Sequence, residues 1–166
     1  MRKKTMDLLF ELLKNSKRSD REIAKVLGVS QPTITRMRNK LVKDDMIQEW
    51  TIIPNFEKMG FEILAITCVK VKESRMLELE KKAAEYFQKK PNVVMAAGGA
   101  QGMGMNGVMI SIHKSYSDFS NFLTNHMTTW GDNIDDHCSI LISLGQRVVK
   151  PFALKYLAQL KKEKTT

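Results

Sequence analysis

The chain has 166 residues, 43% of them hydrophobic, which is enough for one or two small packed domains. Its 27 Lys and Arg residues outnumber its 18 Asp and Glu residues, so the formal net charge is +9. The excess is uneven, because residues 1–50 carry +5, residues 51–148 are neutral and residues 149–166 carry +4. This distribution argues against a uniformly basic chain that binds any polyanion. It favours a DNA-binding head joined to a body with another role.

The first predicted element is an amphipathic helix near the N-terminus. Basic residues precede apolar ones, as in a signal peptide, but Asp7, Glu11 and Lys14 interrupt the apolar run. The spacing of Leu8 and Leu12 gives this helix one apolar face, so we expect it to be the first of a three-helix head. No apolar run is long enough for a membrane span, and two cysteines without paired spacing are typical of the cytoplasm.

The most informative pattern follows this helix and predicts two short helices joined by a tight turn. Ser19 can cap the first helix, and Glu22 can return a bond to the cap, which together form a capping box. Gly28 lies where that helix must end in a left-handed residue. Ser30 can cap the second helix, and Pro32 lies in its first turn. This is a helix-turn-helix unit, which commonly places its second helix in the DNA major groove.

The second helix of the unit has an apolar face and a polar face. At 100° per residue, Ile34, Met37 and Leu41 fall together and are expected in the core. The polar face could be an ordinary solvated surface, but the caps, the turn glycine and the positive charge favour contact with phosphates and base edges. The candidate DNA-binding residues are Ser30, Gln31, Thr33, Thr35, Arg36, Arg38, Asn39, Lys40 and Lys43.

A short connecting region leads out of the head. Met46–Trp50 and Thr51–Ile53 are predicted to form a two-stranded wing, or the strand that leaves it. Asn55–Gly60 is predicted to be a hinge, preceded by Pro54. We therefore expect a winged helix-turn-helix domain over residues 1–56.

The body is predicted to follow the order β-α-β-β-α-β of the ferredoxin-like fold, over residues 57–148. The expected elements are a strand Phe61–Lys72, a helix Arg75–Lys90 capped by Ser74, a strand Asn92–Gly99, a glycine-rich turn, a strand Val108–His113, a helix capped by Ser115 or Ser117 and ending near Met127, a polar loop, and a strand Cys138–Gln146. A basic helix beginning at Pro151 is expected in the tail, residues 149–166. The fold class is thus α+β.

This organisation resembles the Lrp/AsnC family of bacterial and archaeal transcription regulators. The residues that carry the resemblance are Asp7–Leu9, Leu12, Arg18-Ser19, Ile23-Ala24, Leu27–Ser30, Ile34, Leu41, Ile47 and Met59-Gly60. The resemblance implies that the body is a RAM-type domain, which pairs sheet to sheet into homodimers that often assemble into octamers. It also implies that a glycine loop between the second and third strands binds small-molecule effectors between subunits.

The family pattern and this sequence differ at two informative places. The family usually has Gly before the apolar pair that follows the recognition helix, where this chain has Asp44-Asp45. The family's effector loop usually contains an Asp, which would pair with an effector's ammonium group, and this chain lacks it. The residues that the resemblance assigns to the effector loop are Gly102, Met103, Gly104, Met105, Asn106 and Gly107.

Other chemically suggestive groups carry less weight. The glycine-rich segment opens no helix, so it lacks dinucleotide-binding geometry. Methionines around it are expected to fill a core or an interface, with a soft apolar pocket as the alternative. The loop cluster His126, Asp132, Asp135, Asp136 and His137 matches no defined metal site, and we expect neither a metal nor a cofactor.

The two cysteines fall on strands that are neighbours in the ferredoxin-like order. Cys68 is late in the first strand and Cys138 begins the fourth. A reduced pair is the main expectation, and a disulfide is the alternative.

The main functional prediction is a sequence-specific transcription regulator that binds double-stranded DNA as a homodimer. A small-molecule effector in the body would modulate it, and no membrane or enzymatic role is expected. One alternative is a siroheme-type tetrapyrrole decarboxylase, which resembles this family in both domains. Its titratable candidates are His113, Tyr116, His126 and His137, with no evident acid–base pair. The other alternative is an assembly or ligand module that does not read DNA.

Overall fold

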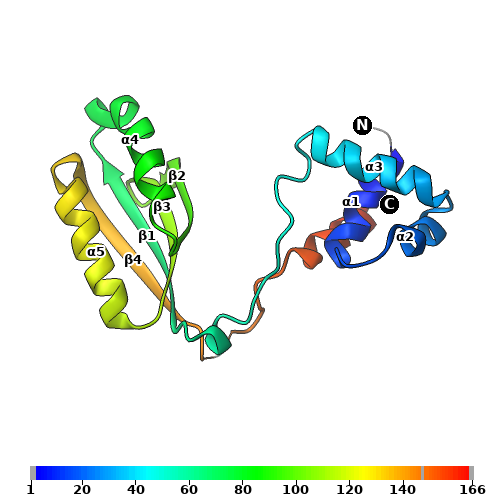
Figure 1. The fold of residues 1–166 in the computed structure, drawn as a ribbon. Helices are drawn as coiled ribbons and strands as arrows, with labels where there is room; N and C mark the ends of the chain where they lie inside the picture. The colour runs from blue at the N-terminus through cyan, green and yellow to red at the C-terminus, as the bar shows by residue number, and fades with distance from the viewer. Residues whose placement is uncertain (1–2, 147, 165–166) are drawn as a thin grey trace. The chain divides into compact units, whose positions relative to one another are not determined.

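The computed structural model describes residues 3–146 and 148–164, and the chain divides into two compact units (Figure 1). The first unit comprises the residues up to Ile53 together with those from Lys150 onward, and the second is Pro54–Val149. The division falls before the hinge because the hinge packs with the body. The Phe56 carbonyl accepts a hydrogen bond from the backbone N–H of Phe61, and their rings meet edge to face at 6.5 Å.

The first unit is built on three helices: α1 (Lys3–Lys14), α2 (Asp20–Leu27) and α3 (Gln31–Lys43). One apolar side of each helix meets in a single core, as their helical periodicity predicted. The buried core residues are Leu8, Leu12, Ile23, Ala24, Ile34 and Leu41. The predicted three-helix head is confirmed.

The caps of the helix-turn-helix also form as predicted. The Ser19 hydroxyl accepts a bond from the Glu22 N–H, and the Glu22 carboxylate accepts one from the Ser19 N–H at 2.7 Å. Gly28 ends α2 in the left-handed region at φ +62°, where a side chain would add strain. Ser30 caps α3 by accepting from the N–H of Thr33 at 3.4 Å. These caps satisfy backbone groups that the helices leave unpaired.

The two predicted wing strands are not formed. Residues 47–55 belong to neither a helix nor a strand, and Ile52 is 74% exposed. A two-stranded wing needs a turn that folds the chain back, and residues 46–53 contain no Gly, Asn, Asp or Pro to make one. The segment runs on as an extended connection into the short 3₁₀ helix η1 (Glu57–Met59).

The tail packs on the first unit. It forms a 3₁₀ helix, η4 (Leu154–Lys164), which contacts α1 and begins three residues later than the predicted start at Pro151. Ala158 is buried in this contact, whereas Phe152 is 70% exposed, so no packing holds the earlier residues in a helix.

The second unit has the predicted order: β1 (Ile63–Val71), α4 (Met76–Gln88), β2 (Val93–Gly102), β3 (Met105–His113), α5 (Tyr116–Trp130) and β4 (Ile134–Ser143). The sheet order is β2-β3-β1-β4, and every neighbouring pair is antiparallel. This is the ferredoxin-like arrangement, so the predicted α+β class is confirmed. None of the helices in the described part of the chain is long and apolar enough to span a membrane.

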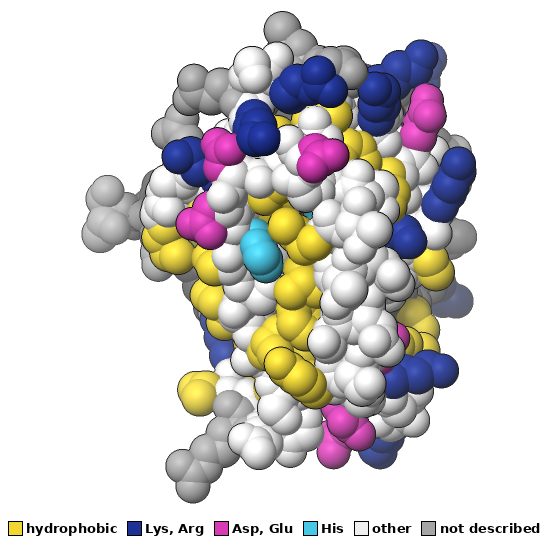
Figure 2. Space-filling model, turned by 90° about the vertical axis from the view of Figure 1, so that its left-hand side faces the viewer, with side chains coloured by type: hydrophobic (Ala, Val, Ile, Leu, Met, Phe, Trp, Pro, Cys, Tyr) yellow, Lys and Arg dark blue, Asp and Glu magenta, His cyan; other side chains and the backbone are white. Residues whose placement is uncertain are grey.

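The sheet has one covered face and one open face. Ala65 and Thr67 are fully buried on the face that the helices cover. Ile66 points to the other face because strand side chains alternate, and it lies opposite Ile140, which is 56% exposed. Figure 2, which looks onto the side where α5 and β4 lie, shows hydrophobic side chains gathered in a band with charged side chains around it. Apolar surface therefore reaches the outside of this unit.

The glycine-rich segment is a β-hairpin and not the predicted loop. β2 continues to Gly102, which pairs with Met105, and only Met103 and Gly104 form the turn. Their φ values are +53° and +75°, as in the type I′ turn that matches the twist of paired strands.

The predicted polar loop before the last strand is also wrong. α5 continues to Trp130, and β4 already begins at Ile134. The hydroxyls of Thr128 and Thr129 bond the carbonyls four residues back, and Trp130 packs on Tyr86 at 5.4 Å, so these polar residues extend the helix.

The two serine caps predicted in the body have different outcomes. Ser115 caps α5 by accepting from the N–H of Asp118 at 3.1 Å, which excludes Ser117. Ser74 does not cap α4, because it lies in a 3₁₀ turn, η2 (Glu73–Arg75), that precedes the helix and ends at Arg75.

Candidate nucleic-acid interface

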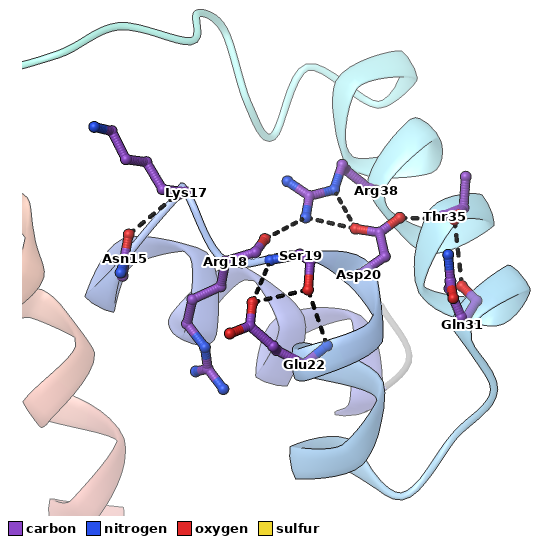
Figure 3. Close-up of polar contacts among 9 residues, drawn as sticks. All are labelled: Asn15, Lys17, Arg18, Ser19, Asp20, Glu22, Gln31, Thr35 and Arg38. Atoms are coloured by element: carbon purple, nitrogen blue, oxygen red, sulfur yellow. Dashed lines mark hydrogen bonds and ion pairs between the residues drawn. The ribbon is translucent and has the colours of Figure 1, made fainter.

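An ion pair between α2 and α3 sets the geometry of the helix-turn-helix. Asp20, the first residue of α2, accepts hydrogen bonds from Arg38 Nε at 2.9 Å and Nη2 at 2.6 Å (Figure 3). The Thr35 hydroxyl donates to its other oxygen at 2.7 Å. Burial opposes ionisation of Asp20, but the Thr35 and Arg38 hydrogen bonds and the Arg38 charge outweigh it and lower its pKa. One carboxylate thus holds two side chains of the recognition helix.

Arg38 is further enclosed on its other sides. Its Nη2 lies 3.5 Å from the Arg18 carbonyl, and its guanidinium lies 5.3 Å from the centre of the Trp50 ring. These contacts place the Arg38 side chain within the helix pair and not out toward a ligand. The contacts of Arg38 therefore position α3 against α2.

A second ion cluster fixes the turn between α1 and α2. Glu11 is only 7% exposed, and its carboxylate pairs with Lys14 and, at 2.6 Å, with Arg18. Desolvation opposes its ionisation, and the two cations overcome this and lower its pKa. The structural roles of Glu11 and Asp20 were not predictable from the sequence, because each appears locally as an ordinary residue of an amphipathic helix.

Several other candidate side chains are engaged at the ends of α3. The Ser30 and Thr33 hydroxyls lie 2.8 Å apart at the N-terminal cap. Near the C-terminus, Lys40 pairs with Asp44 at 2.8 Å across an exposed surface. Such an exposed pair is weak, so Lys40 can exchange Asp44 for a phosphate at little cost.

The middle of α3 presents an open groove. It is lined by Gln31, Pro32, Thr35, Arg36 and Asn39. Within the described residues, the side chains of Gln31, Arg36 and Asn39 form no hydrogen bond or ion pair. Arg can bond guanine with two N–H groups, and Asn and Gln can do the same with adenine. The groove therefore offers the groups that read base edges.

The residues predicted for the effector loop lie at the hairpin turn and at the start of β3, and Asn106 and Gly107 among them line a cleft beside the sheet. Met103 is 78% exposed at the hairpin turn. The Asn106 amide donates to the Val71 carbonyl and accepts from the Val71 N–H, both at 2.7 Å, so it extends the pairing between β3 and β1. A Cβ on Gly107 would lie 2.8 Å from a Val69 methyl group, so this glycine permits close strand packing.

Two of the histidines considered for catalysis, His113 and His126, are buried in the body. His113 is fully buried with Nε2 2.8 Å from the Ser111 hydroxyl, and burial lowers its pKa despite the nearby Asp118 carboxylate. Within the described part of the chain, no three His, Cys, Asp or Glu residues come together to hold a metal.

The two cysteines lie directly opposite each other. Cys68 on β1 pairs in register with Cys138 on β4, and both thiols are free. Burial, and then the neighbouring Cys138, raises the pKa of the Cys68 thiol.

A capped helix-turn-helix with an open polar groove and an excess of cations defines a DNA-binding protein of the regulator class. A family model described as winged helix-turn-helix DNA-binding matches residues 1–48. An HTH-type transcriptional regulator of Pyrococcus furiosus is 30% identical over 107 residues, which cover 64% of this chain and 71% of that protein. Further curated relatives are covered over about half of their length.

Solved structures share the whole two-unit architecture. An AsnC family transcriptional regulator of Agrobacterium tumefaciens has a TM-score of 0.75 and 16% identity, covering 95% of this chain and 99% of that chain. A transcriptional regulator of Neisseria meningitidis in complex with L-Met has a TM-score of 0.75 and 15% identity, with the same coverage. The chain belongs to the HTH-type transcriptional regulators, and its fold is that of the Lrp/AsnC family. The resemblance predicted from the sequence is confirmed.

Proposed function

We propose that this regulator recognises a specific DNA sequence with the side chains of Gln31, Arg36 and Asn39 in the major groove. The observation that carries the proposal is the contrast between two neighbouring arginines. Arg38 is held by Asp20, whereas Arg36 lines the open groove with no polar partner among the described residues. Arg38 and Thr35 then position α3, and Arg36 supplies the readout.

The remaining candidate residues contribute contacts to the DNA backbone. Ser30 and Thr33 lie at the N-terminus of α3, where unpaired N–H groups favour a phosphate. Lys40 and Lys43 lie in its last turn and add charge that neutralises phosphates. These contacts hold the register of the helix and carry no sequence information by themselves.

Binding of the full-length protein to its own upstream DNA, with an unrelated fragment of equal length as competitor, tests the readout. Arg36→Ala is expected to weaken specific binding by about 1–3 kcal/mol and to leave the melting temperature unchanged. Lys25→Ala on α2 is the matched control that removes one exposed cation outside the groove, and it should affect both fragments equally. Unchanged preference for the upstream fragment in Arg36→Ala would remove Arg36 from the reading surface.

The body provides the surfaces for assembly and for an effector. The open apolar face of the sheet, which contains Ile66 and Ile140, supports a homodimer of stacked sheets. A dimer presents two heads, so the DNA site should be approximately palindromic, and dimers could assemble further into octamers. A small-molecule effector at a subunit interface is part of this proposal, because one structural neighbour was solved with L-Met. The absence of the family's acidic residue from this loop argues for an effector other than a simple amino acid.

A further inference from the structure

A cleft lies inside the body between α4 and the sheet. Its volume is about 520 Å³, which falls within the range typical of small-molecule sites. α4 contributes Ala83 and Phe87 to one wall, and β1 and β3 contribute Val69 and Val108 to the other. Figure 1 shows α4 in front of β2 and β3, and contacts between α4 and β2 join the two walls.

Small side chains on both walls keep the cleft open. Ala83 and Ala84 on α4 face Ala96, Gly98 and Gly107 on the strands. Larger residues at these positions would let the helix and the sheet interlock and fill the space, as in an ordinary core. The apolar groups that line it, such as those of Leu79 and Met109, lose dispersion contacts that a ligand could restore.

His126 gives this cleft a polar group. The residue is only 4% exposed and lines the cleft, yet its Nδ1 has no hydrogen-bond partner among the described residues. Its ring is fixed by stacking on Phe87 at 5.9 Å and Phe122 at 6.2 Å. Nδ1 itself is enclosed, so a ligand in the cleft bonds it after a half-turn of the ring about its Cβ–Cγ bond, which keeps the ring plane and its stacking. A buried polar atom without a partner costs about 1–3 kcal/mol, which such a bond would recover.

The protonation state of His126 indicates what it can bond. Burial, and then the charges of Lys90 and His137, lower its pKa to about 4. The imidazole is therefore neutral near pH 7, and it offers one donor and one acceptor and no charge. It suits an N–H, hydroxyl or carbonyl group and not an anion.

We propose that the cleft beneath α4 binds an uncharged, largely apolar small molecule whose single polar group bonds His126. This site differs from the proposed effector site between subunits because all of its walls belong to one chain, although Asn106 and Gly107 of the predicted effector loop also line it. An aromatic ring suits it best, since the Phe87 ring lines the wall and the alanines leave room for a planar body.

The probe for the test is N-phenyl-1-naphthylamine, an uncharged aromatic amine whose fluorescence rises in apolar surroundings. Titration of the full-length protein should give saturable binding. Ala83→Leu fills the cleft and should weaken binding at least about tenfold, and His126→Phe keeps the ring stacking but removes the polar atom and should weaken binding about threefold to tenfold. Glu85→Leu, on an exposed position of α4, is the matched control and should bind like the parent.

Thermal unfolding of the same proteins separates a filled site from a damaged fold. Ala83→Leu should keep or raise the melting temperature, because it adds apolar contacts in an existing space. The proposal is supported if binding is saturable and is weakened by Ala83→Leu but not by Glu85→Leu. Both variants must also keep the melting temperature of the parent or exceed it. Equal binding by all variants would place the probe on the open sheet face and overturn it, as would no saturable binding by the parent protein.

Discussion

The backbone just after the recognition helix is strained at Asp45. Asp45 has φ +52°, in the left-handed region that favours glycine, and the preceding Asp44 has φ −88°. Asp45→Gly should raise the free energy of unfolding by about 0.5–1 kcal/mol, because glycine adopts this conformation without a Cβ penalty. Asp44→Gly is the matched control and should lower it, since it removes the Lys40 ion pair and adds chain entropy. Urea unfolding of both variants checks the prediction, and equal effects of the two would contradict it.

Single residues were predictable where their role is local. The caps at Ser19 and Ser30 and the left-handed Gly28 follow from contacts within three or four residues. The Asp20–Arg38 pair joins residues 18 positions apart, and nothing in the local pattern indicates it. As a result, the sequence identified the polar face of α3 but did not separate the positioning side chains from those that face the groove.

The contact between α2 and α3 has a pH dependence with a defined sign. The lowered pKa of Asp20 means that its ionised form stabilises the folded state above the unfolded value of 3.8, and that this stabilisation is lost as pH falls through the lower folded pKa. Asp20→Asn should lower the free energy of unfolding by about 1–3 kcal/mol at pH 7. The difference from the parent should shrink as the pH falls below the unfolded value of 3.8 and through the lower folded pKa.

Chemical unfolding of Asp20→Asn at several pH values measures this difference. Glu49→Gln, an exposed carboxylate in the extended segment after α3, serves as the control and should leave the pH dependence unchanged. A constant difference across the acid range would mean that Asp20 contributes through packing and not through its charge.

The cysteine pair that joins β1 to the edge strand β4 should be open to oxidation. Directly opposed residues of antiparallel strands have Cα atoms about 4.5–5.5 Å apart, which is within disulfide range. The raised pKa of the Cys68 thiol keeps it protonated and slow to react at neutral pH. Added diamide should therefore convert Cys68 and Cys138 into a disulfide, faster at pH 9 than at pH 7. Thiol titration would show a fall from two free thiols to none, and Cys138→Ser should retain its single thiol without a disulfide between chains. Two thiols after diamide at both pH values would end the disulfide hypothesis.

Element boundaries depended on contacts that sequence patterns do not contain. The glycines between β2 and β3 have low strand propensity, yet pairing such as Gly98 with Gly107 keeps them in the sheet. The polar end of α5 is extended by Thr128 and by the packing of Trp130. The order of strands and helices was predictable because the longer apolar segments are unambiguous, and tertiary pairing decided where each one ends.

At the scale of the whole molecule, the open face of the sheet sets the expected assembly. Leu64, Ile66, Ile140 and Ile142 share this face, with Ile140 and Ile142 at 56% and 40% exposed. A contiguous apolar surface of this kind is unusual on a monomer and is buried efficiently by a second copy about a two-fold axis.

Ile140→Asp should prevent the proposed dimer from forming, because two copies would each place a charge in the apolar contact. The side chain is exposed within one chain, so the secondary structure of the variant should be unchanged. Sedimentation equilibrium measures the mass, with Ser120→Asp on the exposed surface of α5 as the matched control that stays dimeric. The monomer carries one head, so its affinity for a palindromic DNA site should fall at least about tenfold while its contact with a half-site persists. If the Ile140→Asp protein remained a dimer, assembly would use another surface. That other surface would then bring the two DNA-binding heads together.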